Sequence, residues 1–228
     1  QANQLITHKT KKSIINIARI SKELSSLKFP LYFFDYETYA PAVPAFNSYS
    51  PYTRIPFQFS LRILRDPLAE PEHIEFLHPE KTDPSEIVAR LLEEHIEPEG
   101  TVIVWHKPFE KGVNSDIAKR LPKYEKLIER INKQIYDLKD IFSNQHYVHH
   151  DFRGSSSIKK VLPVLVPKLS YKELVIHEGG QASERWWAMV SPKTSPEERA
   201  EIFKNLKIYC GLDTRAMYEI WLELMKLI

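Results

Sequence analysis

The segment LYFFDYETY (31–39) decides the fold that we expect for this chain. It begins with a continuous apolar run, which is typical of a strand buried on both faces of a sheet. Asp35 and Glu37 stand two residues apart near its end. Because side chains alternate along a strand with a period of two, we expect both carboxylates to project from the same face.

Two carboxylates held close together repel each other unless a cation neutralises them. Mg²⁺ and Mn²⁺ prefer such oxygen ligands, so Asp35 and Glu37 are candidate ligands for a divalent cation. Taken alone, a D-x-E triplet at a strand end fits solvated turn chemistry better, because such triplets are common by composition. A metal site therefore needs support from other parts of the chain.

The segments around this strand predict a mixed sheet flanked by helices. Before it, apolar residues at helical spacing predict an amphipathic helix over 13–27, which Pro30 ends. After it follow a Pro-rich loop (41–56), strands over 57–64 and 73–78, a helix over 83–95, a strand over 101–105, a helix to about 121, helical segments over 123–134 and 137–143, a loop over 146–157, a helix from 158, a turn at 179–180 and a helix that opens at Ser195. We expect an α/β domain over 30–228, preceded by a lead-in helix or linker over 1–29.

The composition fits a globular protein and does not indicate its chemistry. The 228 residues suffice for one such domain, and no stretch approaches the roughly 20 apolar residues that span a bilayer. The formal net charge is only +2, so nucleic-acid binding would depend on local basic patches and metal ions. The single cysteine, Cys210, fits a reducing cytoplasm, and the lack of a long apolar stretch predicts no membrane partner. The first residues show no secretory signal, and because the sequence begins without Met we expect a further region upstream.

A second carboxylate motif lies in YCGLD (209–213), a segment with helical character. Tyr209 and Asp213 are four residues apart and share a helix face. That face continues through four apolar residues: Ala216, Met217, Ile220 and Leu224. An acidic side chain on an inward face is costly unless it is paired or bound to metal. A plain ion pair with Arg or Lys, or a helix that begins only at Gly211, explains the isolated motif equally well.

A third carboxylate follows the strand TVIVW (101–105). Glu110 stands at the opening of the next predicted helix, in the sequence HKPFE. Carboxylates are favoured in a first helical turn because of the helix dipole, so this position also has a purely structural explanation.

The order of the three motifs resembles that of the DEDD superfamily of 3′–5′ exonucleases, the DnaQ-like branch of the ribonuclease H-like fold. FFDYETY matches the D-x-E-T motif, including Thr38, and YCGLD matches the variant with Tyr before the last Asp, often called DEDDy. IPFQFSL, DFRGSSSIKKVLP and YCGLDTRAM are also similar to a bacterial domain family of unknown function related to these enzymes. The resemblance covers about residues 30–225 and implies a mixed five-stranded sheet flanked by helices.

The resemblance also implies an activity and a set of site residues. The activity is hydrolysis of phosphodiester bonds at single-stranded DNA or RNA ends with two Mg²⁺ or Mn²⁺ ions. Asp35 would bridge the ions, Glu37, Glu110 and Asp213 would complete their ligands, and Tyr209 would orient the attacking water. Three alternatives remain open: RNA versus DNA, a structure-dependent endonuclease, and a catalytically degenerate module that binds nucleic acid or a protein.

The second motif departs from the family pattern. Glu110 stands where Asp is usual, and His106 stands where Asn is common. Asp116 is a rival for the third ligand, but the distance of Glu110 from the strand end favours Glu110. Asp137 resembles a position that supports structure more than it binds metal.

The remaining candidates carry weaker signals. His146, His149 and His150 with Asp151 could suggest zinc, but we expect a solvated loop because no cysteine lies nearby. The basic residues near the serine-rich turn fit phosphate contacts and solvent equally well: Arg153, Lys159 and Lys160. Four aromatic residues are expected in the core rather than stacked on bases: Phe57, Phe59, Trp186 and Trp187. Three lysines, Lys9, Lys11 and Lys12, are expected in a solvated tail.

Overall fold

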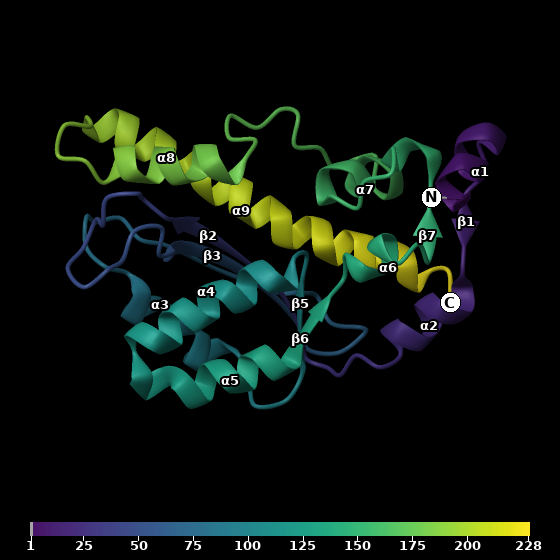
Figure 1. The fold of residues 1–228 in the computed structure, drawn as a ribbon, viewed down its shortest axis with the longest axis horizontal. Coiled ribbons are helices and arrows are strands. Elements are labelled where there is room, and N and C mark those ends of the chain that lie inside the picture. Colours follow the sequence, from purple (N-terminus) through teal and green to yellow (C-terminus); the bar gives the residue numbers. More distant parts are fainter. Residues whose placement is uncertain (1) are drawn as a thin grey trace.

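The computed structural model describes residues 2–228 and contains a five-stranded mixed sheet between two layers of helices (Figure 1). The strands are β2 (Leu31–Tyr39), β3 (Ile55–Leu64), β4 (Glu72–Leu77), β5 (Thr101–Val104) and β6 (Ile135–Asp137), in the order β4-β3-β2-β5-β6. β2 is antiparallel to β3 and parallel to β5, and β5 is parallel to β6. The predicted α/β sheet is therefore present, with β6 added to the strands that the sequence indicated.

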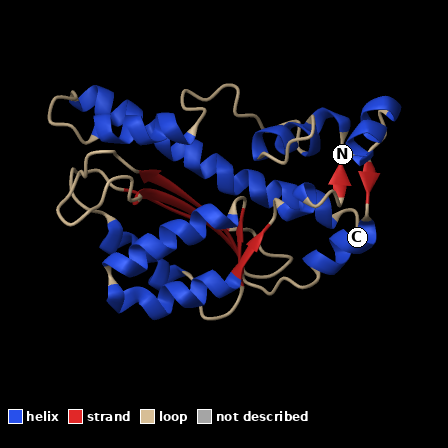
Figure 2. Cartoon of the chain, in the orientation of Figure 1, coloured by secondary structure: helices blue, strands red, loops and turns tan. Residues whose placement is uncertain are grey.

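The helices form a layer on each face of the sheet (Figures 1 and 2). One layer contains α3 (Ser85–His95), α4 (Lys107–Arg120) and α5 (Glu125–Gln134), with the short turn η1 (Pro122–Tyr124) between the last two. The other contains α7 (Ile158–Leu165), α8 (Gly179–Met189) and α9 (Pro196–Met225). Beyond β6 lie α6 (Asp140–Ser143), β7 (Tyr147–Val148) and the turn η2 (His150–Phe152).

β2 lies at the centre of the sheet and is buried on both faces, as its apolar run predicts. Leu31 and Phe33 belong to the hydrophobic cluster beneath α7–α9. Tyr32 and Phe34 belong to a second cluster beneath α3–α5. This alternation gives Asp35 the same face as Phe33, towards α9.

β3 forms where the sequence predicts a strand over 57–64, but its pairing is irregular. The pairing of β2 with β3 slips at Glu37, where Thr38 pairs with Pro56 and Glu37 pairs with Gln58. Phe57 is left as the extra residue of a bulge and packs in the cluster beneath α7–α9, whereas Phe59 packs in the opposite one. Both phenylalanines are in the core, as expected. The polar face is buried because α9 covers it, and Gln58 donates there to the carbonyl oxygen of Leu206 at 3.0 Å.

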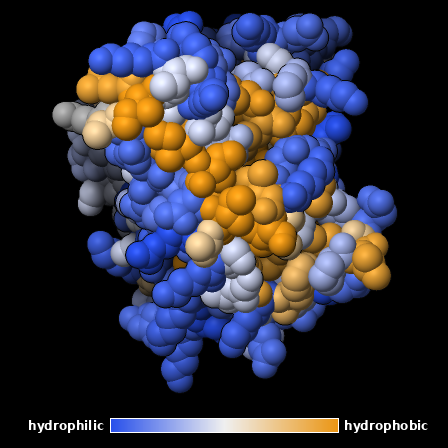
Figure 3. Space-filling model, turned by 90° about the vertical axis from the view of Figure 1, so that its right-hand side faces the viewer, coloured by the Kyte–Doolittle hydropathy of each residue, from blue (hydrophilic) through white to orange (hydrophobic). Residues whose placement is uncertain are grey.

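The N-terminal elements attach to the body of the domain. They are α1 (Ala2–Thr10), β1 (Ile14–Ile15) and α2 (Ile17–Leu24), and β1 pairs with β7. The helix predicted over 13–27 is shorter than expected because Ile14 and Ile15 pair as a strand. Ile20 and Leu24 of α2 join the cluster beneath α7–α9. Figure 3 shows a band of hydrophobic side chains on this side of the molecule, where several residues of α1, α2 and the chain end are exposed: Leu5, Ile6, Ile17, Met225 and Ile228.

The helix ends agree with the sequence at Ser195 and differ from it at Asp83 and at the glycine pair 179–180. Ser195 caps α9 as predicted, and its hydroxyl accepts from the Glu198 N–H. α3 begins at Ser85 rather than directly after Asp83, although the Asp83 carboxylate accepts from the Ser85 N–H. The glycine pair 179–180, predicted as a turn, instead forms the first turn of α8. Over residues 2–228, none of the helices has the length and apolar character needed to cross a membrane.

Candidate metal centre

Four carboxylates from three elements line one cavity of about 510 Å³. Asp35 and Glu37 come from the end of β2, Glu110 from the first turn of α4, and Asp213 from the middle of α9. The structure thus brings together the four acidic residues that the sequence motifs single out. Other lining residues include His106, Lys139, Ser155–Ser157, Lys159 and Tyr209.

Asp35 and Glu37 face a third side chain that carries a metal-binding atom. The Cys210 sulfur lies within 4.8 Å of the candidate ligand atoms of Asp35 and Glu37. Its side chain is fully buried, and burial together with the negative charges of Asp35 and Glu37 raises the pKa of this thiol. The thiol is therefore protonated at neutral pH. Cys210 was not among the sequence candidates, although its place three residues before Asp213 puts it on nearly the same helix side.

Glu110 is held in place by the local structure of α4. Asp137, at the end of β6, accepts hydrogen bonds from the Lys107 N–H at 2.8 Å and from the Lys139 N–H at 3.2 Å. The first of these satisfies a free N–H of the first turn of α4, which carries Glu110. Asp137 does not line the cavity. It therefore supports the helix start, which is the role its sequence position suggested.

Asp116, the rival for the third ligand position, lies elsewhere. It forms an ion pair with Arg54 at 2.7 Å and is absent from the cavity lining. The helical spacing explains the difference, because six residues separate the two carboxylates and turn Asp116 away from Glu110. Geometry therefore supports Glu110.

Glu110 lacks a partner for one of its oxygens. Its side chain is 2% exposed, and Oε2 has no hydrogen-bond partner among the residues that the structure describes. Burial raises the pKa of Glu110 to about 8, and the negative charge of Asp137 adds to this shift. A buried carboxylate oxygen without a donor fits a site that receives a cation, because a bound cation would replace the lost hydration.

The other three carboxyl groups are perturbed in the same direction. Burial raises the pKa of Asp35 well above its usual value, and repulsion from Asp213, Glu37 and Glu110 raises it further. The pKa of Glu37 is also well raised, by burial and by Asp213. Burial raises the pKa of Asp213 to about 6, although Tyr171 and Lys159 oppose the shift. Their negative charges therefore destabilise the folded protein unless a cation or a proton compensates them.

Two tyrosines border the cluster. Tyr209 lines the cavity one turn before Asp213, and burial followed by repulsion from Asp213 raises the pKa of its phenol. Tyr171 donates a hydrogen bond of 2.5 Å to Oδ1 of Asp213. Tyr171 was missed at the sequence level because it lies in the connection between α7 and α8, where no periodic pattern marks it.

The basic residues near the serine-rich turn separate into two groups. Lys159 lines the cavity, donates to the carbonyl oxygen of His177 and lies 5.6 Å from the ring centre of Tyr171. Lys160 and Arg153 are exposed and are not part of the cavity. Lys159 is therefore the one of the three that is placed to meet an anionic group bound near the carboxylates.

Trp186 and Trp187 serve the core, as expected. Trp186 is fully buried, stacks on Phe57 with ring centres 4.7 Å apart, and donates to the carbonyl oxygen of His78. Trp187 stacks on Tyr39 with ring centres 4.7 Å apart. The N-terminal lysines Lys9, Lys11 and Lys12 are exposed, in agreement with a solvated segment.

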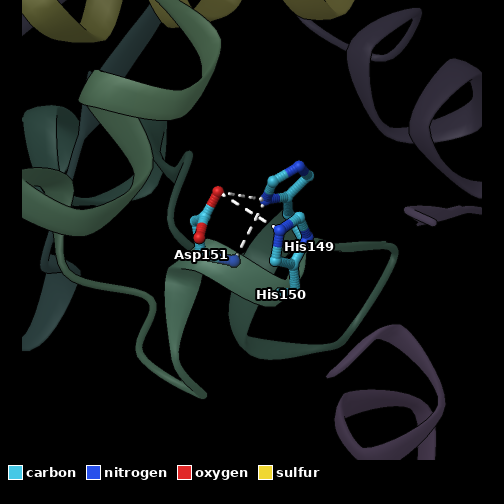
Figure 4. A group of neighbouring side chains, drawn as sticks. All are labelled: His149, His150 and Asp151. Atoms are coloured by element: carbon cyan, nitrogen blue, oxygen red, sulfur yellow. Dashed lines mark hydrogen bonds and ion pairs between the residues drawn. The ribbon is translucent and has the colours of Figure 1, made fainter. Parts of the chain in front are cut away.

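The histidine-rich loop is not the solvated loop that the sequence predicts. The His149 and His150 side chains are only 19% and 20% exposed, and Asp151 beside them is 61% exposed (Figure 4). Packing explains the difference, because the His149 ring lies against Phe152, which is buried in the core. His146 lies apart from this group and pairs with Glu23 at 3.0 Å.

Comparison with known proteins identifies a family for this chain. A family model described as a domain of unknown function (DUF2779) matches residues 32–157, more than half of the chain. An uncharacterized protein of Ureaplasma parvum is 27% identical over the whole chain, which covers 36% of that protein. Uncharacterized proteins of Mycoplasma pneumoniae and Mycoplasma genitalium are 28% and 26% identical over 85% and 90% of the chain, which covers 32% and 33% of them. The chain thus spans about a third of the length of these relatives, and no solved structure matches it. The chain belongs to the DUF2779 family.

Proposed function

We propose that this domain is a metal-dependent 3′–5′ exonuclease that hydrolyses phosphodiester bonds at single-stranded DNA or RNA ends. The observation that carries the proposal is the convergence of Asp35, Glu37, Glu110 and Asp213 on one cavity. Each of these carboxyl groups has a raised pKa, and Glu110 retains a buried oxygen without a partner. Such a site is costly in the free protein and suits divalent cations.

The fold supports the same activity. The resemblance to DnaQ-like exonucleases implies a ribonuclease H-like domain with a mixed five-stranded sheet, and a mixed five-stranded sheet carries Asp35 and Glu37 here, while helices α4 and α9 carry Glu110 and Asp213. The motifs also fall on the expected elements, namely a central strand, the helix after a parallel strand, and a late helix.

The residues of the cavity divide between metal binding and substrate positioning. Asp35, Glu37, Glu110 and Asp213 would hold two Mg²⁺ or Mn²⁺ ions, which activate water and stabilise negative charge on the phosphate. Tyr209 is protonated and can hydrogen-bond the attacking water. Lys159 offers a positive charge on the side of Tyr171 and Tyr209, where a phosphate group can bind.

The proposal is tested with short single-stranded DNA and RNA oligonucleotides that carry a 5′ label, incubated with Mg²⁺ or Mn²⁺. We expect a ladder of progressively shorter labelled products, with no cleavage in EDTA. Asp35→Asn should abolish the ladder. Asp116→Asn is the matched control, because it makes the same change on a carboxylate outside the cavity.

Other products would identify other functions. Immediate release of a labelled mononucleotide would indicate the opposite polarity, and cleavage of a circular single strand would indicate an endonuclease. Metal-independent binding without any cleavage, in wild type and Asp35→Asn alike, would contradict the proposal and favour a degenerate binding module.

A further inference from the structure

A second cavity, of about 690 Å³, lies between α1 and the histidine-rich loop. The loop contributes His149, His150 and Asp151, and α1 contributes His8. This cavity shares no lining residue with the carboxylate cavity. It therefore has two imidazoles and a carboxylate side by side, and a third imidazole elsewhere on its lining, at a place that the proposed nuclease activity does not use.

The donor atoms of the loop are spaced as metal ligands are. Oδ2 of Asp151 lies 3.4 Å from Nε2 of His150 and 3.8 Å from Nδ1 of His149, and Figure 4 shows the carboxylate facing both rings. Candidate ligand atoms of all three residues lie within 4.8 Å of one another. Two donors bound at about 2.0–2.1 Å to a tetrahedral ion are separated by roughly 3.3–3.4 Å. The two separations that involve Asp151 are therefore within about half an ångström of ligating geometry.

One of these rings also has hydrogen-bonding capacity that the chain does not fill. Nδ1 of His150 is buried and has no hydrogen-bond partner among residues 2–228. Nε2 of the same ring faces Asp151, so an ion bound there would leave Nδ1 as the nitrogen that carries the proton. The case for the site therefore rests on the spacing of the donor atoms and on the cavity beside them.

We propose that His149, His150 and Asp151 bind a divalent transition-metal ion of the Zn²⁺ type, and that His8, an exposed residue that lines the same cavity outside this group, turns in as the fourth ligand. Imidazole nitrogen suits Zn²⁺, Ni²⁺ and Cu²⁺, whereas Mg²⁺ prefers a shell made only of oxygen. Two local features oppose binding weakly. Nδ1 of His149 must release the Asp151 N–H that it accepts at 3.1 Å, and the cations Lys11 and Arg153 at the same cavity are exposed, so water screens their charges.

The ion would connect two parts of the chain that are far apart in sequence. His8 lies on α1, whereas the other three ligands follow β7, which pairs with β1. Because α1 contributes few buried side chains, with Thr7 its only buried residue among those described, an ion at this place would fasten α1 to the body of the domain. The role is therefore structural, and the site needs no open coordination position.

The test is a titration of the metal-free protein with Zn²⁺ in the presence of excess Mg²⁺, followed by calorimetry and by the visible absorption of bound Co²⁺. We expect one equivalent bound, an absorption typical of tetrahedral Co²⁺, and a rise in melting temperature. Asp151→Asn and His149→Ala should each weaken binding at least tenfold. Asp151 is mostly exposed, so Asp151→Asn should fold normally. A loss of Zn²⁺ affinity in this variant would therefore reflect the loss of a ligand and not a loss of folding.

His146→Ala is the control, because His146 lies in the same loop but pairs with Glu23. It should bind Zn²⁺ as the wild type does. Unchanged Zn²⁺ affinity in Asp151→Asn and His149→Ala would overturn the site, and unchanged affinity in His8→Ala would overturn the fourth ligand. The inference does not depend on the nuclease proposal, since Asp35→Asn should lose cleavage but retain one equivalent of Zn²⁺.

Discussion

The Tyr171 hydroxyl lies 2.5 Å from Oδ1 of Asp213 and donates a hydrogen bond to it. The two residues come from different elements, since Tyr171 lies between α7 and α8 and Asp213 lies on α9. The bond leaves Oδ2 of Asp213 available and restricts the rotation of its carboxylate. Tyr171 is therefore a positioning residue for a candidate metal ligand.

Tyr171→Phe removes this hydrogen bond and keeps the ring. We expect the affinity for Mn²⁺ to fall by about tenfold to a hundredfold, which is typical when a residue that orients a ligand is lost. Calorimetric titration with Mn²⁺ measures the change. Tyr136→Phe is the matched control, because its hydroxyl also donates to a carboxylate, Glu23, outside the cavity. Equal Mn²⁺ affinities in wild type and Tyr171→Phe would show that the bond only supports packing.

Tyr209→Phe should affect turnover rather than metal binding. Its hydroxyl lies in the cavity one helical turn before Asp213, so it can hold the attacking water. Loss of one positioned polar group slows a chemical step by on the order of tenfold to a thousandfold. Single-turnover cleavage at saturating Mg²⁺ is the measurement. A wild-type rate would mean that Tyr209 only fills space. If Tyr209→Phe lowered both the turnover rate and the metal affinity, Tyr209 would be a residue that positions a metal ligand, as Tyr171 does.

Asp35→Asn should stabilise the metal-free protein while it abolishes cleavage. Asp35 is repelled by Asp213, Glu37 and Glu110, so removal of its charge relieves repulsion. We expect a gain on the order of 1–2 kcal/mol, or roughly 3–6 °C in melting temperature for a domain of this size. Melting in EDTA at pH 8 provides the test. A melting temperature several degrees below that of the wild type would make Asp35 a structural residue.

The metal-free protein should lose stability as the pH rises from about 4.5 to about 8. The pKa of Glu110 is raised from 4.5 in an unfolded chain to about 8 in the folded protein. Over this window the folded state retains a proton that the unfolded state has lost, so the free energy of unfolding decreases with pH. The contribution is on the order of a few kcal/mol and is complete above pH 8.

Glu110→Gln isolates this effect from other titrating groups. The melting temperature of the variant in EDTA should depend less on pH over the same window, and saturating Mg²⁺ should flatten the wild-type profile. Identical pH profiles of wild type and Glu110→Gln would contradict the assignment.

Lys159→Met should weaken the binding of a single-stranded oligonucleotide, whereas Lys160→Met should not. The two lysines are adjacent in sequence, but only Lys159 lines the cavity. A phosphate contact by Lys159 contributes to the salt dependence of binding, so its loss should reduce the magnitude of the slope of log K against log salt by about one. Fluorescence anisotropy at several salt concentrations, with Ca²⁺ in place of Mg²⁺, measures both slopes. Equal slopes for Lys159→Met and Lys160→Met would show that Lys159 makes no specific contact with the oligonucleotide.

The sequence predicted those parts of the fold that periodic patterns determine. The apolar run before Asp35 predicted a central strand, and the inward face of the last helix predicted the placement of Tyr209 and Asp213. The short strand β6 was missed because its three residues carry too little pattern to distinguish them from the neighbouring helices. The bulge at Phe57 was also missed. A bulge depends on how two strands pair, and the residues next to Phe57 in the sequence carry no sign of that pairing.

The site was predictable where a motif combined with an element. Asp35, Glu37, Glu110 and Asp213 each follow from a carboxylate at the end of a strand or on a helix face. Lys159 reaches the cavity, and Tyr171 reaches Asp213, only through the packing of α7 and its following loop against α9, which is a tertiary contact. The half-buried state of His149 likewise depends on Phe152 and the core behind it.

The two helix layers have separate hydrophobic clusters, and the sheet divides them. The carboxylate cavity crosses this division, because Asp213 belongs to the α9 layer, Glu110 belongs to the α4 layer, and Asp35 lies on the strand between them. Cations shared by these residues would act as a cross-link between the layers. Metal binding would then slow amide hydrogen exchange in α4 and α9 together, so that the two halves of the domain open as a single unit.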